Sequence, residues 1–99
     1  MKGKKFSSDE IPYFSYDRAL STTAIKAKLR CPGSRTWIET AAWIMREAAF
    51  RDVWQFLTPS EVARYLDQLS PLLGKNRDFW RYIIGAWREL GKLESSDAA

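Results

Sequence analysis

The chain has 99 residues, 45% of them hydrophobic and 28% charged, which is enough apolar material for one folded domain. Sixteen Lys and Arg against twelve Asp and Glu leave a net charge of +4, a balance compatible with nucleic acid but too mild to prove it. Histidine is absent and Cys31 is the only cysteine, so disulfide frameworks and Cys/His zinc sites within one chain are excluded.

Residues 1–15 are expected to form a flexible arm that is basic at its start and aromatic at its end. Three lysines occur among the first five residues, and Pro12 would interrupt a helix just before Tyr13 and Phe14. We interpret the arm as a frayed tail whose aromatic residues pack on the core. The alternative is an arm that becomes ordered on nucleic acid.

A first helix is expected from Tyr16 to Arg30, with a start after Ser21 as the alternative. The stretch Cys31-Pro32-Gly33-Ser34 then breaks the chain, and Ser34 is a good N-cap for the next helix. A Cys-Pro pair can ligate haem, but a single pair in a turn is assigned no site.

Arg35 to Leu57 is expected to form one long second helix that is central in the domain. A wide apolar stripe runs along one side of it, from Trp37 and Ile38 to Val53. Trp43, Phe50 and Trp54 form a narrower aromatic line on the other side. This line either fills the core or binds a partner.

A third helix is expected from Pro59 to about Leu69, because Thr58 and Glu61 have the spacing of a capping box. The last helix should run from Arg77 to Leu90, with Asn76 as its N-cap. At 100° per residue its core face and its basic ridge fall on opposite sides. The core face comprises Phe79, Trp80, Ile83, Ile84, Ala86, Trp87 and Leu90, and the basic ridge comprises Arg77, Arg81, Arg88 and Lys92.

These elements predict an all-α fold, a compact bundle of about four helices in a single domain over residues 16–93. Residues 94–99 are expected to be a disordered tail. Residues 57–94 resemble the helical core of winged-helix regulators, in which a recognition helix ends at a Leu-Gly step. The connection before the last helix is longer than the usual tight turn, and the chain stops before a wing. The resemblance implies that Arg77 and Arg81 approach the groove of DNA, while Arg88 and Lys92 contact phosphates. The alternative is that these residues only solvate a surface helix.

A second basic cluster surrounds the Cys31-Pro32-Gly33 turn. Residues 1–35 carry eight basic and three acidic side chains, a net charge of +5. Lys26 and Arg30 would also favour the dipole at the C-terminus of the first helix, which is a sufficient structural reason for them. The cluster consists of Lys26, Lys28, Arg30 and Arg35.

The sequence favours a cytoplasmic, non-enzymatic regulator that binds nucleic acid or a nucleoprotein through the basic ridge and the Lys26–Arg35 cluster. The alternative is a protein-interaction module, an adaptor or an inhibitor of a larger host complex, that binds through Trp43, Phe50 and Trp54. A structural homodimer is a third interpretation. Without histidine the usual nucleophile–base pairs are missing, so no catalytic residue is assigned. No metal, cofactor, small-molecule substrate or membrane contact is expected.

Overall fold

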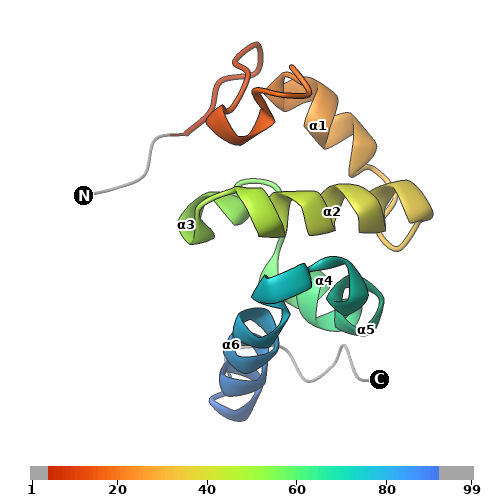
Figure 1. Ribbon diagram of the computed structural model, residues 1–99, viewed down its shortest axis with the longest axis vertical. Coiled ribbons are helices and arrows are strands. Elements are labelled where there is room, and N and C mark those ends of the chain that lie inside the picture. The colour runs from red at the N-terminus through yellow and green to blue at the C-terminus, as the bar shows by residue number, and fades with distance from the viewer. Residues whose placement is uncertain (1–4, 92–99) are drawn as a thin grey trace.

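The computed structural model describes residues 5–91, and in that range the chain is mostly helical and has no β-strand, which confirms the all-α prediction. Figure 1 shows α2 between α1 on one side and α4, α5 and α6 on the other. The α-helices are α1 (Thr22–Lys28), α2 (Arg35–Glu47), α3 (Phe50–Val53), α4 (Pro59–Arg64), α5 (Leu66–Leu69) and α6 (Arg77–Glu89). The described residues also form three short 3-10 helices: η1 (Tyr13–Ser15) precedes α1, and η2 (Ser70–Leu72) and η3 (Gly74–Asn76) connect α5 to α6.

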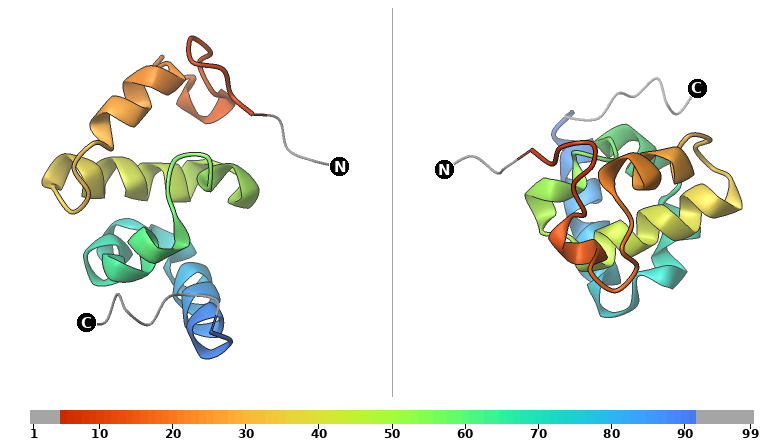
Figure 2. Two further views of the ribbon diagram at one scale, coloured as in Figure 1. Left: turned by 180° about the vertical axis from the view of Figure 1, so that it is seen from behind. Right: turned by 90° about the horizontal axis from the view of Figure 1, so that it is seen from above.

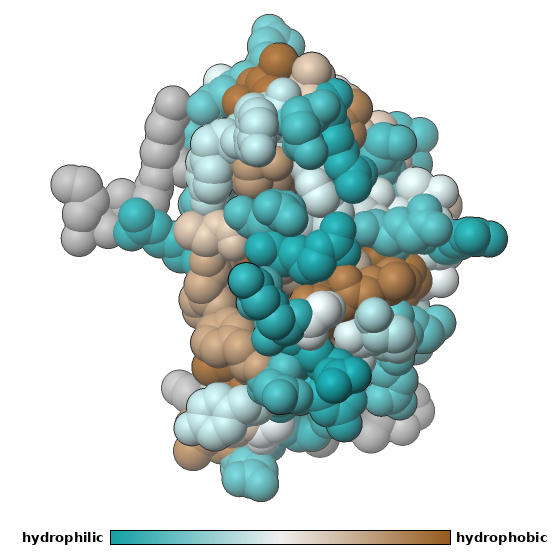
Figure 3. Space-filling view, viewed as in Figure 1, coloured by the Kyte–Doolittle hydropathy of each residue, from teal (hydrophilic) through white to brown (hydrophobic). Residues whose placement is uncertain are grey.

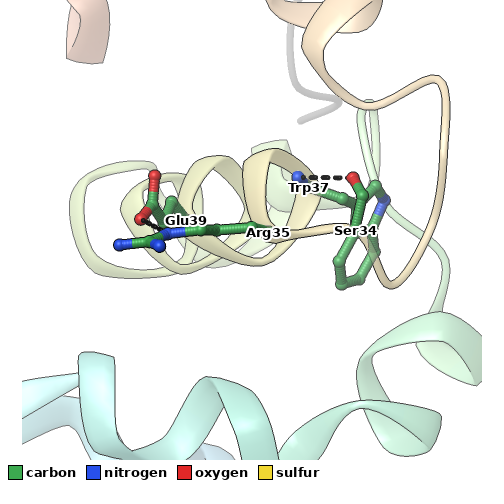
Figure 4. Close-up of polar contacts among 4 residues, drawn as sticks. All are labelled: Ser34, Arg35, Trp37 and Glu39. Atoms are coloured by element: carbon green, nitrogen blue, oxygen red, sulfur yellow. Dashed lines mark hydrogen bonds and ion pairs between the residues drawn. The ribbon is translucent and has the colours of Figure 1, made fainter.

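The N-cap predicted at Ser34 is confirmed, and it fixes the start of α2. The Ser34 side chain accepts a hydrogen bond of 3.1 Å from the backbone N–H of Trp37 (Figure 4). Arg35, the first residue of the helix, places its Nε 3.1 Å from Oε2 of Glu39, one turn later on the exposed surface (Figure 4). The cap satisfies one of the N–H groups that have no partner inside the helix.

The first helix begins only after Ser21, which was the alternative start. Residues before it form a tight turn in which Ala19 has a φ of 55°, a left-handed conformation that a helix cannot contain. The Ser15 hydroxyl holds this turn, because it donates to the Leu20 carbonyl and accepts from the Leu20 N–H. Ser21 then caps α1 by accepting a hydrogen bond from the Ala24 N–H.

The prediction of one helix from Arg35 to Leu57 is wrong, because the chain breaks at Ala48 and Ala49. Both residues are extended, with ψ values of 152° and 149°. The Tyr13 hydroxyl accepts a hydrogen bond of 2.7 Å from the Ala49 N–H and donates one of 2.6 Å to Asp52 Oδ2. A partner from the N-terminal segment therefore satisfies the N–H at the break, and α3 starts in a new direction.

The helix predicted from Pro59 to about Leu69 is also divided, although its predicted capping box is present. Thr58 and Glu61 exchange two hydrogen bonds of 3.1 Å, each side chain accepting from the other residue's backbone N–H. Tyr65, with φ −107° and ψ 19°, then separates α4 from α5. Its ring lies over Gly33, where a Cβ atom would come within 2.8 Å of the Tyr65 hydroxyl oxygen.

The N-terminal segment, which belongs to the predicted arm, lies against α2 and α3 from Phe6 onward. The Phe6 N–H donates to Gln55 Oε1 at 3.0 Å, and Phe14 is only 4% exposed. The Phe14 ring packs on Trp43 of α2, with ring centroids 5.3 Å apart. Phe14 thus belongs to the core and Phe6 packs against it, whereas Tyr13 is 52% exposed.

The core extends over both sides of α2. Trp37, Ile44 and Met45 are almost completely buried, as are Ile25 of α1 and Ile84 of α6. The α1–α2 connection and α6 lie at different ends of the molecule in all three ribbon views (Figures 1 and 2). Among the described residues, none of the helices has the length and apolar character needed to cross a bilayer.

Candidate functional site

Aromatic rings from α3 and α6 meet on one side of the molecule. The Phe50 ring stacks on Trp80 at 5.5 Å between centroids and contacts Phe79 at 5.9 Å. Trp54, which ends α3, contacts Trp87 at 5.6 Å. Trp80 forms the floor, since it is 2% exposed and its indole N–H donates to the Met45 carbonyl at 3.2 Å. The break after α2 creates this arrangement by turning Phe50 toward α6.

Several large apolar side chains of α3 and α6 remain exposed to solvent. Phe50, Phe79 and Leu90 are 38%, 48% and 70% exposed. Figure 3 shows brown and tan atoms gathered over α3 and α6. We call this the aromatic surface and define it as Phe50, Trp54, Phe79, Ile83, Trp87 and Leu90. Large apolar side chains grouped in this way are typical of binding surfaces rather than of a bare monomer surface.

The buried side of α6 differs from the predicted one. Only Trp80 and Ile84 are fully buried, while Phe79 and Leu90 of the predicted core face are exposed. On a helical wheel with 100° per residue, the buried side lies about 70° nearer to the arginines than the sequence pattern indicates. The helix is turned because Phe50 and Trp54, which the single-helix prediction placed elsewhere, pack against Trp80.

Two arginines of the predicted basic ridge consequently contact the segments next to α6, namely η2 and α4. Arg81 Nη1 donates to the Ser70 hydroxyl at 3.3 Å, and Arg88 Nη2 donates to the Ala63 carbonyl at 3.5 Å. Arg77 Nε lies 3.9 Å from Oδ1 of its neighbour Asp78. All three arginines keep exposed surface, and the fourth member, Lys92, lies outside the described residues.

The Lys26–Arg35 cluster is exposed. Lys26, Lys28 and Arg30 lie at and just after the C-terminus of α1, and Arg35 is the first residue of α2. This connection and α6 occupy different ends of the molecule (Figure 2). Lys28 also lines a cavity with Arg46 and Leu72, while Arg81 forms a hydrogen bond with Ser70, two residues before Leu72.

The predicted aromatic line of Trp43, Phe50 and Trp54 is divided between two places. Trp43 is 2% exposed and lies under Phe14 and Arg18. Phe50 and Trp54 lie on the α6 side, beyond the Ala48–Ala49 break. Only the latter two contribute to the aromatic surface.

A groove that the sequence did not indicate lies beside α2. It has a volume of about 390 Å³, and its lining includes Arg18, Lys28, Thr36, Thr40 and Arg46. Thr36 and Thr40 lie one turn apart on α2, as the helical period would have shown, and Arg46 follows in the last turn of the helix. Arg18 reaches the groove from the turn before α1, and no local pattern predicts that approach.

Two reactive side chains stand out in residues 5–91, namely Cys31 and Tyr13. In that part of the chain His, Cys, Asp and Glu nowhere gather as three or more groups able to hold a metal, and Cys31 is exposed. Tyr13 has a perturbed hydroxyl. Burial raises its pKa above the ordinary value of 10.0, and the hydrogen bond it donates to Asp52 raises the pKa further, against a smaller lowering by the bond from Ala49. These two partners give the perturbation a structural explanation.

Comparisons with known proteins return no match: no family model, no curated protein and no solved structure is similar to this chain.

Proposed function

We propose that this protein is a protein-interaction module that binds its partner through the aromatic surface of α3 and α6. The observation that carries the proposal is the exposure of Phe50 and Phe79 around buried Trp80, with Leu90 exposed at the end of the same helix. A partner that covers these side chains would gain roughly 25 cal/mol for each Å² of apolar surface removed from water. Tryptophan and phenylalanine supply much of that area for few rotatable bonds.

The partner that fits is a protein with apolar side chains at the centre of its interface and a net negative charge. The chain carries a net charge of +4, which would attract such a partner and speed its association. Function in this interpretation is adaptor-like or inhibitory, since occupation of a surface requires no chemistry of its own.

The double variant Phe79→Ser with Leu90→Ser tests this function. Both side chains are substantially exposed, so their loss removes binding area with little effect on the core. Tyr16→Ser is the matched control, because Tyr16 is 82% exposed and lies on the N-terminal segment away from α6. Capture of partners from a nuclease-treated lysate should fail with the double variant and persist with the control. Equal capture by both proteins would refute the proposal.

The same variants distinguish self-association from binding of a different protein. Sedimentation of the pure wild-type chain reports whether a second copy covers the aromatic surface. A dimer that dissociates in the double variant would assign the surface to a homodimer instead of a different partner.

Nucleic-acid binding is the second candidate function, and the exposed arginines of α6 favour it. Arg77, Arg81 and Arg88 occupy one side of the helix, where they could contact successive phosphates. A helix-turn-helix role for the C-terminal region would make α6 the recognition helix, with α4 before it. Between those two helices lie α5, η2 and η3, a longer connection than such a motif usually has.

A further inference from the structure

We infer that the groove beside α2 is a binding site for a small phosphate-bearing compound. The groove shares none of its residues with the aromatic surface, so the inference is independent of the proposed function. It rests on three cationic side chains that converge on one cavity from separate parts of the chain: Arg18, Lys28 and Arg46.

The positive charge of the groove is not neutralised by the chain itself. Three cations line it against one carboxylate, Glu39, which leaves two positive charges in excess. Glu39 moreover forms an ion pair with Arg35, whose Nε lies 3.1 Å from Glu39 Oε2, and Arg35 does not line the groove. Within residues 5–91 neither Arg18, Lys28 nor Arg46 forms an ion pair. Like charges gathered in a concave site raise the local potential and favour an anion there.

Two of the cations are held in place before any ligand binds. The Arg18 guanidinium lies over the Trp43 ring, 4.3 Å from the ring centroid, and Trp43 is itself buried. Arg46 Nη1 donates to the Leu72 carbonyl at 2.8 Å. A guanidinium carries five N–H donors, so each arginine retains others for a ligand. Oriented donors lose less conformational entropy on binding than free ones do.

The rest of the lining suits phosphate oxygens. Thr36 and Thr40 lie one helical turn apart on α2, and each offers a hydroxyl that can donate to an anionic oxygen. Arginine matches phosphate through two parallel hydrogen bonds, and lysine adds a point charge. A volume of about 390 Å³ falls within the usual range for small-molecule sites, roughly 300–1,000 Å³. The cavity is therefore large enough for a phosphate group with an organic substituent.

The convergence of the cations also distinguishes a small ligand from a nucleic-acid strand. A strand places its phosphates in a row and needs cations along a track. Arg18, Lys28 and Arg46 come instead from the turn before α1, the end of α1 and the last turn of α2, around one cavity. Such an arrangement fits several oxygens of one or two adjacent phosphate groups.

Isothermal titration of the full chain at low ionic strength tests the site, with orthophosphate, pyrophosphate and a nucleoside monophosphate as separate probes. At least one probe should bind saturably with one site per chain. The probe that binds best identifies the source of the phosphate as inorganic or organic. Absence of saturable binding by all three would overturn the inference.

Charge variants locate the binding. Lys28→Gln should weaken the best probe roughly tenfold, the loss expected for one charge-assisted hydrogen bond. Lys26→Gln is the matched control, because Lys26 is exposed on the same short helix and does not line the groove. Equal losses in the two variants would show general attraction to a basic surface and would overturn the site.

One further variant should strengthen phosphate binding, a result that misfolding cannot produce. Glu39→Gln removes the carboxylate from the lining and should tighten phosphate binding several-fold. Weaker binding by this variant, with its helical circular dichroism intact, would contradict the inference. Single-stranded DNA is tested as a competitor of the probe. If it displaces the probe, and its affinity falls equally in Lys26→Gln and Lys28→Gln, the ligand is a nucleic-acid strand and the inference is overturned.

Discussion

The Tyr13 hydroxyl donates a hydrogen bond of 2.6 Å to Asp52 Oδ2, which ties the N-terminal segment to α3 across 39 residues of chain. Asp52 is 7% exposed and also accepts from the Gln55 side-chain amide at 3.0 Å. The same Tyr13 oxygen accepts from Ala49. One hydroxyl thus connects the N-terminal segment to the break that sets the direction of α3, and through α3 to the aromatic surface.

Tyr13→Phe should lower the free energy of unfolding by about 1–3 kcal/mol, because it leaves a buried carboxylate oxygen and a backbone N–H without this partner. Urea denaturation followed by circular dichroism measures the loss. Tyr16→Phe removes a hydroxyl from a ring that is 82% exposed and should change little. A loss of similar size in both variants would contradict a special role for Tyr13.

Alkaline pH should weaken the fold through the same hydroxyl. The pKa of Tyr13 is raised in the folded protein above the ordinary 10.0 of the unfolded chain. The unfolded state therefore loses this proton first, and the stabilisation, complete below pH 10, is lost as the pH rises through the folded pKa. Melting temperatures measured from pH 9 to about pH 11 should fall more steeply for the wild type than for Tyr13→Phe. If the melting temperatures of the two proteins fall equally with pH, ionisation of Tyr13 is not the cause of the loss of stability.

The two tryptophans of α6 should differ in their contribution to stability. Trp80 is 2% exposed, so Trp80→Ala should cost about 3–5 kcal/mol, a large part of the stability of a small domain. Trp87 is only partly buried, and Trp87→Ala should cost less. Thermal denaturation of both variants compares the two losses, and a larger loss for Trp87→Ala would contradict the deeper burial of Trp80.

Binding of nucleic acid through α6 predicts a specific charge effect. Arg81→Glu with Arg88→Glu should abolish binding, and the affinity of the wild type should fall steeply with salt. The pair Lys26→Glu with Arg30→Glu makes the same charge change at the other end of the molecule. Fluorescence anisotropy with duplex DNA, single-stranded DNA and RNA compares the two pairs. Failure of the wild type to bind any of them at low salt would eliminate this candidate function.

Local signals predicted the helix starts well. Ser34 and Thr58 cap α2 and α4 as their spacing indicates, because a cap depends on residues within one turn. Asn76 is the exception. Helix α6 does begin at Arg77, but the Asn76 side chain makes no capping bond and its amide lies 3.5 Å from the Arg46 carbonyl oxygen instead.

The interruption of the second helix could not be predicted in this way. Alanine is the strongest helix former, so nothing near Ala48 and Ala49 predicts an extended conformation. The partner that satisfies the break is Tyr13, 36 residues earlier. The core face predicted for α6 is right for Trp80 and Ile84 and wrong for Phe79 and Leu90. The aromatic residues beyond the break, Phe50 and Trp54, are the ones that pack on Trp80. The groove was missed for a similar reason, since Arg18 reaches α2 only in the folded chain.

The Ala49 amide gives a direct means of following the N-terminal segment by hydrogen exchange. Its proton is bonded to a side chain of that segment and to no helical carbonyl, so it should exchange whenever the segment lifts away. Amides in the middle of α2 would exchange only on larger unfolding. A faster rate at Ala49 than in α2 would measure the free energy of docking of the segment, and equal rates would mean that the segment and α2 open as one unit.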